Sequence, residues 1–124
     1  MYSNQYKKGK AKLKSIGQSA EQAIEELSKV SPDLASYAIE FTCGEIYSRP
    51  GLDAKSREMI AIAALTVLGN ALPQLKIHVE GAIKNGCSNV EIREIIIQMS
   101  VYAGFPVVFN SIMAAEEVFK KLTF

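Results

Sequence analysis

Apolar residues recur at helical spacing along almost the whole chain. Positions three, four and seven apart share one face of a helix, whereas a half-buried strand alternates apolar and polar residues. No run of four strictly alternating residues flanked by turn residues is present. The pattern therefore predicts an all-α fold of about six helices, forming a single domain over residues 1–124.

Residues 1–30 are expected to form an N-terminal helical arm, followed by a core over about residues 32–122. The apolar face of the arm contains five residues: Leu13, Ile16, Ala20, Ile24 and Leu27. Gly17 interrupts this face and is expected to split or bend the helix. Ser31 and Pro32 are typical of an N-cap followed by the first helical residue. The helix that they open is expected to bury a stripe of four residues: Leu34, Tyr37, Ala38 and Phe41.

Turn and capping residues mark the later helix boundaries. Pro50 and Gly51 predict a turn, and Asp53 is expected to cap the helix that follows. That helix is apolar nearly all round from Met59 to Leu68, so we expect protein to surround it on all sides. The remaining boundaries are predicted at five short motifs: Gly69-Asn70, Leu72-Pro73, Asn85-Gly86, the capping box Ser88 to Glu91, and Gly104-Phe105-Pro106.

The last two predicted helices present apolar stripes of their own. The first of them carries Ile92, Ile95, Met99 and Tyr102, and the second carries Val108, Ile112, Ala115, Phe119 and Leu122. Together with the helix over Met59 to Leu68, these surfaces are more than a chain of 124 residues can easily enclose. The pattern therefore predicts self-association.

Charge and hydropathy lower the expectation of two classes of partner. Fourteen Lys and Arg residues against thirteen Asp and Glu residues give a net charge of +1, which offers no global attraction for nucleic acid or an anionic membrane. The run of lysines from Lys7 to Lys14 is interpreted as a solvated helix face. The most apolar stretch has ten residues, against the roughly 20 that a membrane-spanning helix needs. The N-terminus lacks the apolar run of a secretory signal, and we expect a cytoplasmic protein.

The number and spacing of the cysteines disfavour a thiol redox centre and a metal centre. Cys43 and Cys87 stand far apart in sequence and the chain has one histidine, so neither a disulfide framework nor a structural zinc site is predicted. No Cys-x-x-Cys motif, the usual form of a dithiol redox centre, is present. Cys43 is expected to be a small core residue and Cys87 an exposed thiol.

Four side chains are candidates for chemistry. His78 falls on the predicted inner face of its helix, where it fits either an acid-base group or a core histidine with satisfied nitrogens. Glu58 precedes Ala61 and Ile62 at helical offsets; it suits proton transfer on an apolar face, or a first-turn acid that complements the helix dipole. Arg49 and Arg57 are suited to clamp an anionic substrate, or to pair with neighbouring glutamates.

Several short motifs, in order and spacing, resemble the carboxymuconolactone decarboxylase family over about residues 40–118. They are Gly44-Glu45-Ile46-Tyr47, Arg49-Pro50-Gly51-Leu52-Asp53, Arg57-Glu58, Gln74-Leu75-Lys76-Ile77-His78, Asn85-Gly86, Glu91-Ile92-Arg93-Glu94 and Tyr102-Ala103-Gly104-Phe105-Pro106. The resemblance implies the all-α fold shared with alkylhydroperoxidase D and a ring-shaped homo-oligomer, commonly a hexamer. It also implies two chemical branches.

The redox branch places a Cys-x-x-Cys just before the histidine, where this chain has residues around Ala71 and Gln74. An alkylhydroperoxidase-type or peroxiredoxin-type activity is therefore the less favoured alternative. The other branch removes carbon dioxide from γ-carboxymuconolactone in aromatic catabolism without a cofactor. By this resemblance His78 and Glu58 are expected to be catalytic, Arg57 and Arg49 to bind substrate, and the chain to be a carboxy-lyase without metal or cofactor.

The substrate is expected to be a small anionic lactone or β-keto acid. In the decarboxylases an arginine often follows the glycine that ends the helix before His78, and this chain has Asn70 there. The sequence therefore leaves the identity of the lactone or keto acid open. A non-catalytic oligomeric binding protein is the second alternative.

Overall fold

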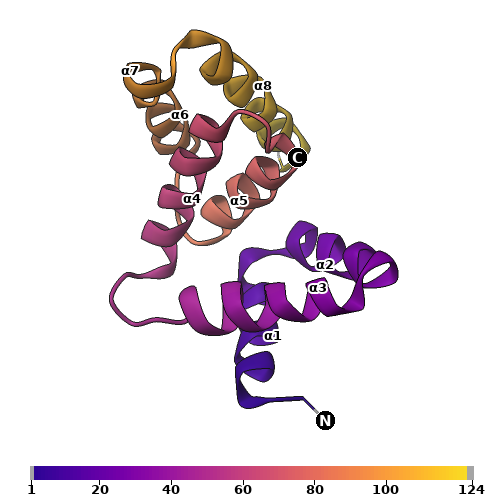
Figure 1. Cartoon of the computed structure of the whole chain (residues 1–124). Coiled ribbons are helices and arrows are strands. Elements are labelled where there is room, and N and C mark those ends of the chain that lie inside the picture. The colour runs from indigo at the N-terminus through magenta and orange to yellow at the C-terminus, as the bar shows by residue number, and fades with distance from the viewer. Residues whose placement is uncertain (1, 123–124) are drawn as a thin grey trace. The chain divides into compact units, whose positions relative to one another are not determined.

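A computed structural model describes residues 2–122, and every regular element in that range is helical (Figure 1). The predicted all-α fold is confirmed. The chain divides into two compact units, one up to Ala54 and one from Lys55, and each is described by itself. Over residues 2–122 no helix combines the length and the apolarity that a membrane crossing requires.

The first unit contains α1 (Asn4–Ile16), α2 (Gln18–Val30), α3 (Pro32–Tyr37) and the π-helix η1 (Ala38–Ile46). Gly17 separates α1 from α2 with a φ of 136°, a value that residues with a Cβ rarely adopt. The predicted interruption of the N-terminal helix is therefore a complete break. Ser31 and Pro32 open α3 as predicted, although the Ser31 side chain makes no capping hydrogen bond.

In the first unit, α1 and η1 pack with their backbones unusually close. A Cβ placed on Gly9 of α1 would collide with the backbone carbonyl of Ile39 in η1. A Cβ on Gly44 of η1 would likewise collide with the carbonyl oxygen of Gln5. Both positions therefore require glycine for this packing.

The apolar stripe predicted for the segment after Ser31 is wrong. Leu34, Tyr37 and Phe41 are 53%, 64% and 60% exposed, and Ala38 is half-buried. The buried face instead contains Ala35, Ile39 and Cys43, each four residues after the last. A π-helix bonds each amide to the carbonyl five residues back, as Tyr47 N does with Thr42 O, which widens the turn and moves same-face residues towards a spacing of four.

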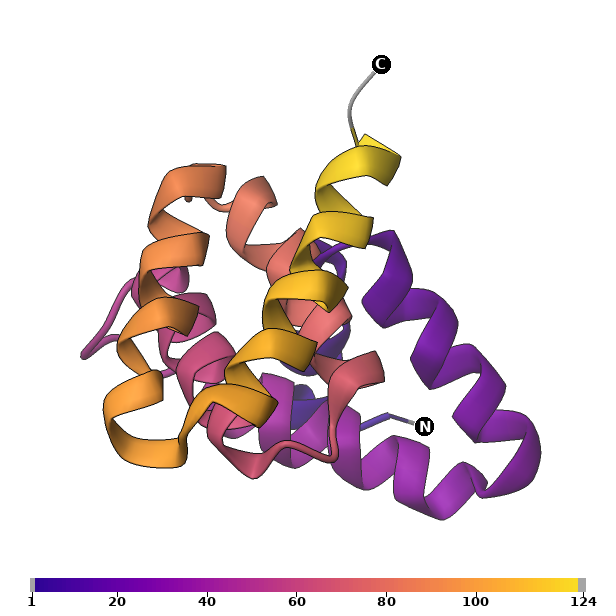
Figure 2. The same cartoon turned by 90° about the horizontal axis from the view of Figure 1, so that it is seen from above.

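The second unit contains α4 (Ala54–Leu68), α5 (Leu72–Lys84), α6 (Asn89–Gln98), α7 (Ser100–Ala103) and α8 (Phe105–Leu122), which Figures 1 and 2 show from two directions. Its core is drawn from four of these helices and the turn before α6. The fully or nearly buried members are Ile62, Leu75, Val79, Ala82, Cys87, Ile92, Ile96, Val108, Ala114, Ala115, Val118 and Phe119.

The predicted start of α6 is confirmed atom by atom. The hydroxyl of Ser88 accepts a hydrogen bond from Glu91 N at 3.0 Å, and Ser88 N donates to Glu91 Oε1 at 2.9 Å. This reciprocal pair satisfies two amides that the first turn of a helix otherwise leaves open. The carboxylate of Glu91 also pairs with Lys55, and these hydrogen bonds lower the pKa of Glu91.

Ile60, Val67 and Leu68 of α4 are exposed in the single chain, so the prediction that protein surrounds this helix depends on self-association. One prediction about a buried face in the second unit is wrong. Tyr102, expected on the same buried stripe as Ile92, is 70% exposed. A break at Met99 ends α6 and places Tyr102 in the separate helix α7, so the helical spacing does not continue across it.

Candidate functional site

Glu58 begins the buried face of α4. It is 1% exposed, and the residues that follow it on this face are Ala61, Ile62 and Thr66. The apolar face predicted from its spacing is therefore confirmed. A charged side chain is seldom buried so completely without a partner, because loss of hydration disfavours the ionised form.

His78 lies on α5 beside the part of the helix that enters the core. Its neighbours Leu75, Val79 and Ala82 are completely buried, whereas the side chain of His78 keeps 18% of its surface exposed. The imidazole is therefore neither sealed inside the unit nor free on its surface. This partial access is what a proton-transfer group needs in order to meet a small molecule.

Glu58 and His78 are in direct contact. Nδ1 of His78 lies 3.1 Å from Oε1 and 3.2 Å from Oε2 of Glu58. A helical rise of about 1.5 Å per residue places the two residues at different heights on neighbouring helices. The sequence alone therefore does not predict this contact. The structure shows that the Glu58 side chain spans the gap without a bridging group.

The contact distinguishes the two imidazole nitrogens, because only Nδ1 faces Glu58. A carboxylate in its ionised form only accepts hydrogen bonds, and with Glu58 in that form Nδ1 of His78 is the donor of the pair. Nε2 is then the nitrogen that can give or take a proton. A buried carboxylate that fixes the tautomer and orientation of a histidine in this way is a recurrent arrangement in acid-base catalysis.

The two candidate arginines differ in burial and in the unit to which they belong. Arg57 directly precedes Glu58 on α4; it is half-buried, and its Nε atom is completely buried. Arg49 is exposed in the segment between η1 and α4 and belongs to the first unit. Arg57 therefore lies on the same helix as the carboxylate of the pair, whereas a role for Arg49 at the pair stays a prediction.

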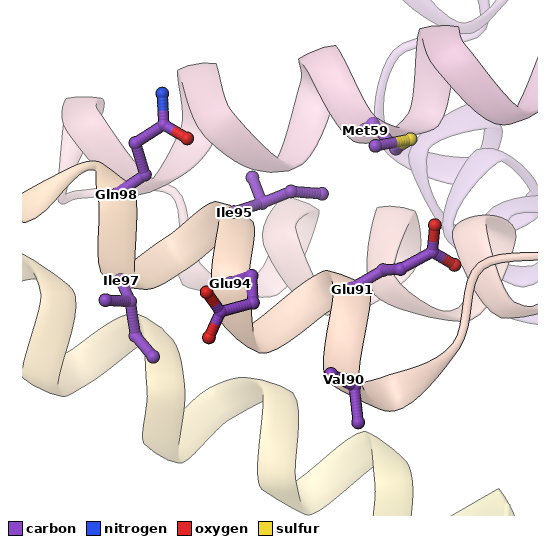
Figure 3. A pocket seen from close by; sticks show the side chains of 7 residues that line it. All are labelled: Met59, Val90, Glu91, Glu94, Ile95, Ile97 and Gln98. Carbon is purple, nitrogen blue, oxygen red and sulfur yellow. The ribbon is translucent and has the colours of Figure 1, made fainter.

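A surface groove of about 370 Å³ lies alongside α4, in the same unit as the Glu58 and His78 pair. Met59 of α4 lines it together with residues of α6 that include Glu91, Ile95 and Gln98 (Figure 3). Neither Glu58 nor His78 lines this groove. It is therefore a neighbour of the pair and not its own pocket.

The environment of the cysteines changes one prediction. Cys43 is buried as expected, but Cys87 is only 5% exposed, and the prediction of an exposed thiol is wrong. The turn before α6 carries Cys87 into the core of the second unit. Burial raises the pKa of the Cys87 thiol, the charge of Glu91 raises it further, and Lys55 acts in the opposite direction. A raised pKa disfavours the reactive thiolate.

Metal-ligating side chains do not gather in the part of the chain that the structure describes. Over residues 2–122, no group of three or more His, Cys, Asp and Glu residues is placed to hold a metal ion. The Glu58 and His78 pair supplies two such ligands.

Sequence analysis missed one buried polar group. Ser111 of α8 is completely buried, and its hydroxyl makes no hydrogen bond with any described residue. The available signal was its position on the buried stripe of α8, three residues after Val108 and four before Ala115. No chemistry follows from this position alone.

A family-level comparison identifies the chain. The model of the carboxymuconolactone decarboxylase family matches residues 32–117, which is more than half of the sequence and includes both Glu58 and His78. The chain belongs to this family. The resemblance noted from short motifs is therefore confirmed.

Three relatives are similar to this chain over most of its length. A 4-carboxymuconolactone decarboxylase of Acinetobacter baylyi is 36% identical over 101 residues, covering 82% of this chain and 75% of its own. An uncharacterized 15.0 kDa protein of Paracoccus denitrificans is 36% identical over 94 residues, covering 75% and 70%. A nitrosuccinic acid decarboxylase of Metarhizium robertsii is 33% identical over 78 residues, covering 63% of this chain and 54% of that enzyme. Two of the three are thus named as decarboxylases, which supports a decarboxylase-like function at modest identity.

Proposed function

We propose that this chain is a carboxy-lyase that works without a cofactor on a small anionic lactone or β-keto acid. The observation that carries the proposal is the direct contact of a buried carboxylate, Glu58, with the partly exposed imidazole of His78. Family membership and the decarboxylase names of two relatives support the same class of reaction.

Decarboxylation requires an acceptor for the electron pair that remains on the substrate when carbon dioxide leaves. When the bond between the carboxylate and its neighbouring carbon breaks, the electron pair of that bond moves into an adjacent carbonyl or conjugated lactone and forms an enolate. A hydrogen-bond donor at the enolate oxygen lowers the barrier, and a proton source then restores a neutral product. Such a reaction requires one acid placed near the enolate oxygen and cationic side chains that bind the substrate.

His78 is assigned the role of acid. In its protonated form Nδ1–H stays on Glu58, and Nε2–H is donated first to the developing oxyanion and then transferred to the product. This transfer leaves neutral His78 with a lone pair on Nε2, and a proton from water restores the starting state. Glu58 does not meet the substrate in this scheme. It holds the imidazolium in place through the contact with Nδ1.

Arg57 and Arg49 are assigned to substrate binding. A guanidinium pairs with a carboxylate through two parallel hydrogen bonds, a geometry that suits the seating of an acid that keeps a second carboxylate. Arg57 lies in the same unit as the Glu58 and His78 pair. Arg49 is kept as a substrate-binding candidate on the sequence resemblance.

Incubation of the purified protein with a panel of acids tests the proposal. The panel contains 4-carboxymuconolactone and nitrosuccinic acid, the acids in the names of the two decarboxylases, together with several β-keto acids. Enzyme-dependent release of carbon dioxide, followed by mass spectrometry of the product, is the expected result. Heat-denatured protein corrects for the spontaneous decarboxylation of β-keto acids. Failure on every acid combined with tight binding of a partner protein would replace the proposal with a non-catalytic role.

A further inference from the structure

The first unit contains a cavity of its own, of about 390 Å³, formed by residues of α1, α2, α3 and η1. Its floor includes the buried side chains of Ala35 and Ile39, and Ile24 and Ser36 are half-buried beside them. All its lining residues precede Ala54, so the cavity belongs to the first unit, and neither Glu58 nor His78 lines it. Its volume falls within the usual range for small-molecule sites, about 300–1,000 Å³.

One wall of this cavity is a stacked pair of aromatic rings. The rings of Tyr2 and Tyr6 stack with centroids 4.1 Å apart and planes 9° from parallel. Ser3, between them in sequence, holds this end of α1 in place: its hydroxyl accepts from Tyr6 N at 3.0 Å and donates to Glu40 of η1 at 2.9 Å. The start of α1 is therefore held against η1, while Tyr2 remains 64% exposed.

The rim of the cavity carries more negative than positive charge. Glu21 and Glu25 of α2 line it, four residues apart and both exposed, and Lys10 of α1 is the cation among its lining residues. Within residues 2–122, none of these three side chains takes part in an ion pair. Burial raises the pKa of Tyr6, and the nearby Tyr2 and Glu40 raise it further. The chemistry of the cavity thus favours a positive ligand.

We propose that this cavity binds a small organic amine with an aromatic or other apolar body. Its ammonium group would pair with Glu21 and Glu25, and the tyrosine faces would attract the same charge through their ring quadrupoles. Its apolar body would lie against Ile24 and Ile39. This inference is independent of the proposed decarboxylation.

Three probes of one shape test the amine site. These are 2-phenylethylamine, its neutral counterpart 2-phenylethanol, and the anion phenylacetate, each titrated into the full chain and followed by the NMR shifts of backbone amides. The amine is expected to bind saturably, with the largest shifts at residues around Tyr6 and Ser36. The alcohol is expected to bind more weakly and the anion not to bind. Equal affinity for the amine and the alcohol would overturn the proposal.

Substitutions on α2 separate a built site from general electrostatics. Glu25→Gln is expected to weaken amine binding by about fivefold, the upper scale for a solvent-exposed ion pair, and to leave binding of the alcohol unchanged. Glu26→Gln is the matched control, because Glu26 is exposed on the same helix and does not line the cavity. A loss in Glu26→Gln as large as in Glu25→Gln would contradict the proposal, as would an unchanged affinity in the double variant Glu21→Gln, Glu25→Gln.

Discussion

Glu58 of α4 and His78 of α5 meet with 3.1 Å between Oε1 and Nδ1, although 20 residues and a turn separate them in the sequence. Glu58 is almost completely buried, whereas His78 retains partial access to solvent. In the proposed reaction Glu58 positions the imidazole and Nε2 of His78 is the proton donor. The two side chains therefore predict different consequences on substitution.

Glu58→Gln is expected to lower the turnover number by about 100-fold or more and to change KM little. The amide can present its NH2 group to Nδ1, which would stabilise the tautomer that carries the proton on Nε2 and would not hold the imidazolium. Steady-state kinetics are measured over a range of pH. The pH profile of turnover is expected to change, because loss of imidazole orientation alone would leave it unaltered. Glu80→Gln on α5 serves as the control, since no chemistry is assigned to Glu80. Wild-type kinetics in Glu58→Gln would contradict the positioning role.

Chelators are expected to leave activity unchanged. No cluster of three or more metal-ligating side chains occurs over residues 2–122, and the proposed acid is an imidazole. Turnover is measured after dialysis against EDTA and again after addition of a divalent metal. An activity that disappears on dialysis and returns with the metal would show that the scheme lacks a component.

The thiols are expected to take no part in turnover. Both cysteines are buried, and the raised pKa of Cys87 means that its thiolate forms only at a more alkaline pH than that of an ordinary cysteine. Thiol labelling of the native protein should therefore be slow at neutral pH and accelerate as the pH rises. The variant Cys43→Ala, Cys87→Ala should keep its decarboxylase activity. Peroxide reduction with a dithiol donor that this variant loses would favour the alkylhydroperoxidase-type alternative.

Gly9→Ala is expected to destabilise the first unit. The added Cβ would collide with the backbone carbonyl of Ile39, which cannot move aside as the end of a flexible side chain can. Overpacking of this kind costs about 1–3 kcal/mol of the free energy of unfolding. Chemical denaturation followed by circular dichroism measures the loss. Gly51→Ala is the matched control, because a Cβ there meets nothing within 4 Å. Equal stability of the two variants would show that the backbones can separate at no cost.

Self-association is expected from the apolar side chains that the chain leaves exposed. In the second unit these include Ile60 and Leu68 of α4 and Phe105 and Phe109 of α8, each more than half exposed. Burial of such surface against other copies would remove it from water, and the family resemblance predicts a hexamer. Light scattering at micromolar concentration measures the mass. A stable monomer of 13.6 kDa would refute the expectation.

The sequence predicted the helix boundaries better than the buried faces. Gly17 and the Ser88 to Glu91 capping box act locally, through backbone conformation and hydrogen bonds within one turn, so their effect can be read without knowledge of neighbouring helices. The face that a helix buries depends on its partner. Leu34 and Tyr37 of α3 are exposed, whereas Ile39 of η1 is buried where Gly9 lets α1 come close, and sequence periodicity carries no sign of that approach.

The residues of the candidate site could be predicted more readily than its geometry. Glu58 was identifiable as a carboxylate on an apolar face and His78 as the one histidine on an inner face. The contact between Glu58 and His78 could not be predicted, because an estimate from helical rise omits the crossing of the helices and the reach of a glutamate side chain. The burial of Cys87 was missed because a turn sequence is usually exposed, whereas this turn packs into the core.

The most direct test of the account is the turnover of His78→Ala on the acid that the wild-type protein decarboxylates fastest. His78 is the proposed proton donor, so the turnover number is expected to fall by about 100-fold or more while the oligomer size and circular dichroism remain those of the wild type. His78→Ala with undiminished carbon dioxide release would contradict the central claim that the Glu58 and His78 pair carries the reaction.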